Sequence, residues 1–433
     1  MDLSKLIGIA VFLGYIPYIL SKRYTQVRKS YLLYILYLFP CIDLFITPVQ
    51  YGGFSSFDGI SFLTLLIIFS KFKFSLRTNG IYIFLFLTFF IVLFLGSLNS
   101  EFFIESLFPY LKAILLFFFA KCVIEEINSD PDFGLELLKR LKFLALISIG
   151  FLVMQLIIGL GFTFYAALNT NTNTGAESTF RYPSFFHDAQ KYAQYLAMSS
   201  FLFFIDTDRT KVRSNIYKLT LFLIMVIGLI LSGGRAGFLG MCCGLAFLFL
   251  TGRNKYKMLG LLGIFIASFL IITFADKIPL LNRSETVDES YEIRNRYWQQ
   301  ALNIYEDNTI LGIGIGNYRN YVAAYSPDQF WLLENGEILF FDHPESGYLK
   351  FLIEFGLIGF CICMLFFIIP IGSFVIEYIK TKCYTPFFLI ASVISFLVSF
   401  ITVYTLSDYR IAVLLIAVIC VLIKSRNVFE DIC

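Results

Sequence analysis

The chain has 433 residues, of which 58% are hydrophobic, 18% aromatic and only 15% charged. Soluble domains average about 45–50% apolar and about 25% charged residues, so these charges are too few to cover a soluble protein of this length. The net charge is +3, and no basic block alternates with aromatic residues as a nucleic-acid channel requires. Composition therefore excludes soluble, disordered and nucleic-acid-binding classes and indicates a polytopic membrane protein.

Apolar segments near the length that a membrane span needs, roughly 17–25 residues, follow one another along the whole chain. The first lacks a small-residue cleavage site and is interpreted as a membrane segment, not a removed signal peptide. We expect an all-α, polytopic integral membrane protein with about 12–14 transmembrane helices, residues 1–433 forming a single membrane domain. The segments are Leu6–Leu20, Tyr31–Thr47, Ile60–Ser70, Ile81–Leu98, Phe103–Ala120, Phe143–Leu160, Tyr192–Ile205, Leu219–Leu231, Gly237–Leu250, Met258–Phe274, Tyr348–Ile376, Phe387–Tyr404 and Ile411–Ile423.

Lysine and arginine fall on every second connection between these segments. The intervening connections, such as Pro48–Phe57 and Leu98–Phe102, carry no basic residue. Because basic residues favour cytoplasmic loops, the alternation predicts the orientation, and it places the C-terminal tail with Lys424 and Arg426 in the cytoplasm. The basic connections are Ser21–Ser30, Lys71–Asn79, Lys121–Lys142, Asp206–Lys218, Gly252–Lys257 and Lys380–Lys382.

The same rule places the longest polar connections on the outer face, which is the periplasm of a bacterium with two membranes. They are a large, partly helical loop at 275–347 and a smaller loop at 162–191, and the turn Ser232–Ala236 lies on that face too. Both histidines of the chain, His187 and His343, fall in these loops. The acidic residues form no clear cluster for a divalent cation, so we expect no metal site.

The turn Ser232–Gly237 (Ser-Gly-Gly-Arg-Ala-Gly) sets one arginine among small residues between two apolar segments. A bulky ligand can approach such a residue closely, and the planar fork of Arg235 suits phosphate oxygens. The alternative is an interfacial arginine that extends to lipid headgroups, and the sequence alone gives it equal weight.

Residues 291–307 (YEIRNRYWQQALNIYED) have the spacing of an amphipathic helix that could lie on the membrane surface. Arg294 lies one turn before Trp298 and borders the apolar side, whereas Arg296 is on the solvated side. Arg294 is therefore the better ligand candidate, although salt bridging within the helix is the alternative for both arginines. The apolar side carries Ile293, Tyr297, Ala301 and Ile304.

The segment 312–318 (Gly-Ile-Gly-Ile-Gly-Asn-Tyr) looks superficially like a nucleotide-binding loop. No alternating strands and helices surround it, and it lies outside the cytoplasm, where nucleotides are. Glycines that let a loop pack closely against a helix are the better interpretation.

The segment 342–348 (Asp-His-Pro-Glu-Ser-Gly-Tyr) leads directly into a long apolar helix. His343 and Glu345 are expected at the membrane edge, where a base could meet a lipid-linked substrate. The alternative is a helix cap formed by Ser346 or Asp342, with the other side chains solvated.

In chain order, these motifs resemble those of the bacterial O-antigen polymerase and O-antigen ligase family. That family is similar in its many spans, its large outer loop before a late helix, and its Ser-x-Ser/Gly-Arg-Gly/Ala turn. Its Arg-x-x-x-Trp helix and Gly-x-Gly-x-Gly stretch correspond to Arg294, Trp298 and 312–316. An earlier loop resembles Arg181–Leu196, a late element resembles Glu345–Phe360, and the first half of the chain agrees only in hydropathy.

One position departs from the family pattern. Alignment through Tyr348 puts Glu345 where the ligases of this family carry a histidine proposed as catalytic base, and Ser346 where they carry asparagine. This departure favours the polymerase branch. It leaves Glu345 and His343 both open as the base.

The resemblance implies a glycosyltransferase of the bacterial inner membrane that joins polyprenyl-diphosphate-linked oligosaccharide repeat units on the periplasmic face and releases polyprenyl diphosphate, such as undecaprenyl diphosphate. The donor is preactivated, so no cofactor is expected, and arginines can take the place of a metal at the diphosphate. Polysaccharide or lipopolysaccharide biosynthesis would be its setting, and a flippase and a chain-length regulator its partners. The expected site comprises Arg181, Arg235 and Arg294 for the diphosphate, Glu345 or His343 for catalysis, and His187, Asp188 and Tyr348 in substrate-binding loops.

Two other functions remain open from the sequence. A ligase would transfer the glycan to lipid A core or to protein, whereas a polysaccharide or solute transporter would catalyse no transfer. A transporter should show paired charges inside several helices, but only Lys112 sits well within an expected segment.

The charge pattern makes a direct prediction about orientation. An enzyme active only in the cytoplasm, fused after Ile310, should show no activity, because this residue belongs to the loop that is expected outside. Strong activity of that fusion in intact cells would overturn the predicted topology.

Overall fold

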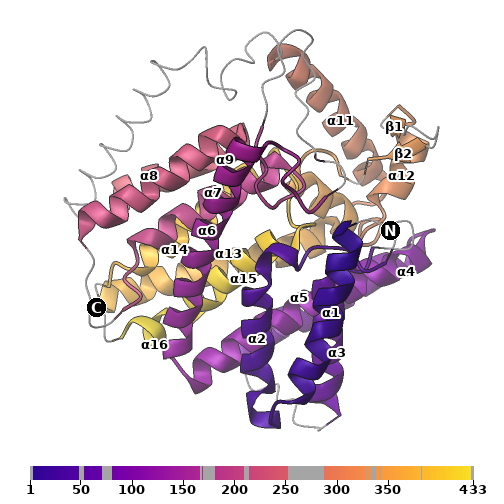
Figure 1. Ribbon diagram of the computed structural model, residues 1–433. Coiled ribbons are helices and arrows are strands. Elements are labelled where there is room, and N and C mark those ends of the chain that lie inside the picture. The colour runs from indigo at the N-terminus through magenta and orange to yellow at the C-terminus, as the bar shows by residue number, and fades with distance from the viewer. Residues whose placement is uncertain are drawn as a thin grey trace.

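Helices dominate the computed structural model, as the apolar composition predicts, and one two-stranded hairpin accompanies them (Figure 1). The structure describes residues 3–47, 53–70, 80–165, 168, 181–208, 214–251, 287–328, 330–332, 338–341, 343–381 and 383–430. The statements below concern these residues.

Six helices in this part of the chain are long and apolar enough to cross a membrane. Shorter apolar helices accompany them, and together they confirm the expected all-α, polytopic membrane fold. The long helices are α1 (Leu3–Leu20), α4 (Gly80–Leu98), α5 (Phe103–Ser129), α6 (Asp132–Ile158), α8 (Asn215–Ser232) and α13 (Gly347–Thr381). The shorter ones are α3 (Ser56–Phe69), α9 (Arg235–Thr251), α14 (Pro386–Ser399) and α15 (Tyr409–Ile423).

Two expected segments differ from full spans. The segment Tyr31–Thr47 is a short helix, α2 (Val27–Tyr37), followed by a 3₁₀ turn at Phe39–Cys41, because Pro40 has no N–H to continue an α-helix. The segment Tyr192–Ile205 is α7 (Ala189–Ser200) with a 3₁₀ turn at Phe201–Phe204, and both are buried among other helices. The expected segment Met258–Phe274 lies outside the described residues.

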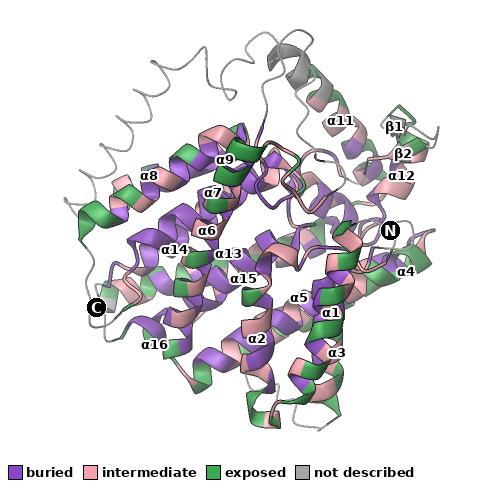
Figure 2. Ribbon diagram, viewed as in Figure 1, coloured by how far each residue is buried: buried purple, intermediate pink, exposed green. Residues whose placement is uncertain are grey.

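The centre of the bundle is formed by α14 and α15, whose residues are almost all buried, while exposed residues lie on outer helices such as α1 and α8 (Figure 2). Buried polar side chains in this centre bond to neighbouring helices. The Ser392 hydroxyl donates to the carbonyl of Met198 at 2.8 Å, and the Gln194 amide donates to the Ser399 hydroxyl at 2.6 Å. These bonds satisfy polar groups that would otherwise be costly to bury.

Glycines bring α9 close to the core. A Cβ atom on Gly240 would lie 2.2 Å from the carbonyl oxygen of Ser395 in α14, and one on Gly237 would lie 2.7 Å from the backbone of Ala193 in α7. Small residues permit such backbone contacts between membrane helices. The N-terminus of α9, which carries Arg235, is therefore fixed against α7.

The described part of the loop 275–347 folds against α13. It contains α11 (Val287–Asp307), α12 (Tyr318–Tyr325), and the antiparallel strands β1 (Phe330–Leu332) and β2 (Ile338–Phe340), and these elements lie together at one edge of the bundle (Figure 1). A small second core anchors them, formed by Ala301, Ile304, Ile313, Tyr318, Val322 and Ile353.

The glycine loop packs onto a break in α13. Gly356 has φ 64° and interrupts the helix, which leaves backbone groups without helical partners. The loop provides hydrogen-bond partners for two of these groups. Ile313 N–H donates to the carbonyl of Ile353 at 3.0 Å, and Gly314 N–H donates to the carbonyl of Glu354 at 3.1 Å. A Cβ on Gly312 would lie 2.4 Å from the nitrogen of Gly356, which agrees with the close-packing interpretation of these glycines.

Two contacts between connections are compatible with the sides that the charge pattern predicts. Arg28 of the first basic connection pairs with Glu125 and Glu126, at the start of another expected cytoplasmic connection, at 3.0 and 2.9 Å. At the other end, Asn317 of the large loop donates to Ser100 at 2.8 Å, and both are expected outside. Each of these contacts joins two connections that the charge pattern assigns to the same side.

Close packing of α9 generates a stability prediction. Gly240→Ala should lower the thermal midpoint of the detergent-purified protein, because the added methyl group overlaps α14 and such overpacking costs about 1–3 kcal/mol. Gly150→Ala is the matched control: a Cβ there has nothing within 4 Å, so its midpoint should stay or rise. Equal midpoints for both variants would contradict the packing of α9 on α14.

Candidate functional site

The loop before α7 and the turn between α8 and α9 form one unit. Helix α8 ends at Gly233, which adopts the left-handed conformation with φ 65°, and α9 begins at Arg235. The Arg181 side chain lies on this turn: its Nε donates to the carbonyl of Ser232 at 3.2 Å, and a Cβ on Gly233 would lie 3.3 Å from it. The structure thus brings together Arg181 and Arg235, which are far apart in the sequence.

Arg181 is 5% exposed, yet its terminal guanidinium nitrogens have no hydrogen-bond partner among the described residues. Desolvation lowers the pKa of Arg181, the negative charge of Asp188 opposes this, and the positive charge of Arg235 lowers the pKa further. A cation that is desolvated and close to another cation is stabilised by binding an anion.

Arg235 lies at the surface at the first position of α9. It makes no hydrogen bond or ion pair to any residue in the described part of the chain, and the charges of Arg181 and Arg294 both act on it. A helix N-terminus already carries a partial positive charge, so an arginine there is unfavourable unless an anion is bound. We refer to Arg181, Arg235 and Arg294 as the arginine cluster.

Arg294 extends from α11 to Glu345. Its Nε donates to Oε2 of Glu345 at 3.2 Å, and the two side chains are 29% and 40% exposed. The predicted helix phase is confirmed, since Ala301 and Ile304 are buried while Arg296 faces outward and pairs with Asp328. One expected diphosphate ligand and one expected catalytic residue are therefore in contact.

Positive φ angles mark both site loops. Ser184 (φ 55°) and Glu345 (φ 52°) are the non-glycine residues with positive φ in the described part of the chain. Such conformations cost about 1–3 kcal/mol each and persist where the surrounding structure holds them, often at functional sites. Ser184 follows Arg181 in its loop, and Glu345 pairs with Arg294, so both strained positions adjoin the arginine cluster.

The other expected residues have contacts of their own. The His343 ring lies 5.6 Å from that of Tyr404. The side chain of Asp188 caps α7 by accepting from Gln190 N–H at 2.7 Å, and the hydroxyl of Tyr348 donates to the carbonyl of Leu397 at 2.8 Å. Asp188 and Tyr348 therefore hold helices in place.

His187 lies beside Tyr165, with ring centroids 5.3 Å apart. Desolvation and the nearby charge of Lys191 lower the pKa of His187, which favours the neutral imidazole at neutral pH. The expected caps of α13 are partly observed: Ser346 accepts from Leu349 N–H at 3.4 Å, whereas Asp342 is outside the described residues.

Some residues that support this site were not predicted from the sequence. Gln155 in α6, and Asp408 and Arg410 at the start of α15, hold the loop that carries Arg181. The available signal was a pair of opposite charges, Asp408 and Arg410, at the beginning of an apolar segment, where ionisable residues require partners. Gln155 gave no signal, because a single amide in an apolar helix has no distinctive spacing.

A comparison with protein families identifies a similarity over part of the chain. Residues 220–364 match the model of the O-antigen ligase family. The matched stretch includes Arg235, Arg294, His343 and Glu345, and it ends after the broken part of α13. A search of curated proteins found no match.

The arginine cluster makes a prediction about stability. Arg235→Gln should leave the thermal midpoint unchanged or raise it, because Arg235 has like charges nearby and no acidic partner among the residues that the structure describes. Arg28→Gln is the control, because it removes a cation that pairs with Glu125 and Glu126, and it should lower the midpoint. An equal loss in both variants would show that Arg235 has a structural role.

The family match supports glycosyl transfer of the O-antigen ligase and polymerase type, and it agrees with the motifs at Ser232–Gly237, Arg294 and Glu345. Over residues 220–364 the chain is therefore similar to the O-antigen ligase family.

Proposed function

We propose that this protein is a polysaccharide polymerase of the inner membrane. It joins oligosaccharide repeats carried on polyprenyl diphosphate at the periplasmic face and releases polyprenyl diphosphate. The observation that carries the proposal is the arginine cluster. The terminal guanidinium nitrogens of Arg181 and the side chain of Arg235 have no partner among the described residues, and Arg181 contacts the turn that leads into α9, which begins at Arg235. Such an arrangement suits the charge and the planar oxygen geometry of a diphosphate.

The chemistry follows from the donor. A hydroxyl oxygen of the acceptor sugar forms a bond to the anomeric carbon of the donor, and the bond from that carbon to the diphosphate oxygen breaks. The electron pair leaves with the diphosphate, whose developing negative charge the arginine cluster stabilises. The hydroxyl proton passes to a base or to water.

Glu345 is the residue that we assign to the acceptor hydroxyl. In the absence of substrate its carboxylate is bonded to Arg294. A diphosphate competes for that arginine, and a carboxylate released from its ion pair is available to accept a hydrogen bond from the acceptor. His343 is the alternative: it lies two residues before Glu345 in the same loop, and its ring contacts that of Tyr404.

The polymerase branch is proposed because Glu345 occupies the position of the ligase histidine. We also propose that the loops at 162–191 and 275–347 are periplasmic and that the C-terminus is cytoplasmic. The distribution of lysine and arginine along the chain supports this orientation. A flippase that delivers lipid-linked repeats and a regulator of chain length are the partners that such a reaction would need.

Purified protein incubated with short lipid-linked repeats tests the function. A polymerase produces a ladder of chain lengths from this substrate alone. A ligase, which the name of the matched family favours, transfers the glycan only after a second acceptor such as lipid A core is added. A transporter produces neither, and that result would contradict the proposal.

Substitutions in the arginine cluster should remove activity from protein that still inserts. We expect Arg235→Ala and Arg294→Ala to abolish the ladder and the corresponding lysine variants to be poorly active, since lysine cannot form a bidentate fork. Arg296→Ala is the matched control on α11, and its loss should be small because its partner Asp328 is outside the cluster. A larger effect at Arg296 than at Arg294 would contradict the assignment.

The base is tested by substitutions that keep shape. Glu345→Gln removes the charge and should reduce chain output strongly, and His343→Asn should reduce it less. Output is compared at matched expression, because Glu345→Gln also removes the ion pair with Arg294. Near-normal output from Glu345→Gln would transfer the assignment to His343.

A further inference from the structure

Two buried side chains from α6 and α15 form hydrogen bonds to the loop that carries Arg181. The first is Gln155 of α6, which is fully buried. Its amide nitrogen donates to the carbonyl of Ser184 at 2.8 Å, and its amide oxygen accepts from Ser184 N–H at 2.8 Å. The Gln155 amide thus bonds both the N–H and the carbonyl of Ser184, as a residue on a neighbouring β-strand would. These two bonds hold Ser184 in its positive-φ conformation.

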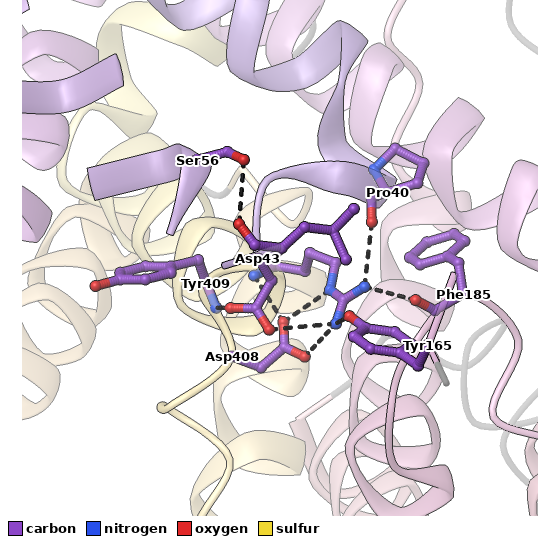
Figure 3. Close-up of polar contacts among 9 residues, drawn as sticks. Pro40, Asp43, Ser56, Tyr165, Phe185, Asp408 and Tyr409 are labelled. Carbon is purple, nitrogen blue, oxygen red and sulfur yellow. Dashed lines mark hydrogen bonds and ion pairs between the residues drawn. The ribbon is translucent and has the colours of Figure 1, made fainter. Parts of the chain in front are cut away.

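The second is Arg410 of α15, which is also fully buried. Figure 3 shows the carbonyls of Pro40 and Phe185, the phenol of Tyr165 and the carboxylates of Asp43 and Asp408 around its guanidinium. The bond to the Phe185 carbonyl is 2.6 Å long, and the Asp408 carboxylate accepts from Nε and Nη2 at 2.8 and 2.6 Å. Every nitrogen of this guanidinium is therefore bonded.

Burial of this ion pair is difficult to explain by stability alone. Apolar residues of similar volume often stabilise a protein as well as a buried ion pair does, because desolvation offsets most of the attraction. The guanidinium also does what an apolar side chain cannot do: it fixes the Phe185 carbonyl in the site loop and, at 3.2 Å, the Pro40 carbonyl after α2. Its ring contact with Phe186, 4.4 Å from the ring centroid, adds a further restraint on the loop.

We propose that Gln155 and Arg410 are positioning residues, which hold residues 181–187 so that the Arg181 guanidinium faces the diphosphate beside Arg235. Neither residue touches the substrate. The inference rests on the proposed function, since it assigns a role within the same site. It links α6 and the central helix α15 to the binding of the lipid-linked donor.

The test uses Arg410→Lys and Gln155→Met in the full-length protein, with Arg140→Lys as the matched control. Arg140 pairs with Glu136 one turn earlier in α6 and lies over the ring of Tyr37, so its replacement by lysine removes no contact to the site loop. Lysine at 410 keeps the charge but cannot span Asp408 and the Phe185 carbonyl together. Methionine at 155 keeps the size and removes both bonds to Ser184.

Two measurements are made on each variant. Hydrogen exchange of the amides in 181–187 should become faster in both positioning variants and stay unchanged in Arg140→Lys. The KM for the lipid-linked donor should rise about tenfold to a hundredfold with a smaller change in kcat, because a misplaced binding group weakens the site without removing it. Arg181→Lys should show the KM effect without the change in exchange, since its loop remains anchored.

Unchanged exchange and unchanged KM in folded Arg410→Lys and Gln155→Met would overturn the inference. Faster exchange with a normal KM would also overturn it, because the loop would then be held for stability only. If one variant fails to accumulate, the other decides. If the wild-type protein makes no polymer, the proposed function fails, and the exchange measurement still shows whether these residues hold the loop.

Discussion

A buried arginine must form all its hydrogen bonds inside the protein. Arg410 is such a residue, and its hydrogen bonds connect the loops at the end of the bundle that is expected outside. Its guanidinium donates hydrogen bonds to the connection after α2, to the loop before α7 and to the residue that precedes α15. In an apolar bundle such bonds are directional where side-chain packing is not, so they fix the positions of loops that the hydrophobic core leaves undetermined. The loop that presents Arg181 depends on this arrangement.

The arginine cluster shows the opposite condition. Arg410 is fully bonded, whereas Arg181 has terminal nitrogens without partners and Arg235 has no ion pair in the described part of the chain. This difference supports the proposal that the arginine cluster binds an anion, because an unsatisfied guanidinium is stabilised when an anion binds, whereas the satisfied Arg410 holds the fold. The left-handed Ser184 and Glu345 show that backbone strain is concentrated in the same two loops.

Much of the fold was predictable from the sequence because membrane spans are encoded by composition. The helical period also separated Arg294, which faces Glu345, from the outward-facing Arg296, and the glycines at 312–316 indicated close packing correctly. The short α2 was not predicted, since its apolar run continues past Pro40. The contacts of Gln155 and Arg410 with the site loop could not be predicted, because these side chains bond to backbone groups of Ser184 and Phe185, and the identity of a residue does not show what its backbone binds.

Binding of polyprenyl diphosphate, the released product, tests the central claim most directly, because it depends on the arginine cluster and not on the sugar or the branch of the family. The affinity of purified protein in lipid nanodiscs is measured for the wild type, Arg235→Ala and Arg296→Ala. The account predicts that Arg235→Ala weakens binding at least about tenfold, the loss of one charge-assisted contact, while Arg296→Ala binds like the wild type. Equal affinity in Arg235→Ala and the wild type would contradict it.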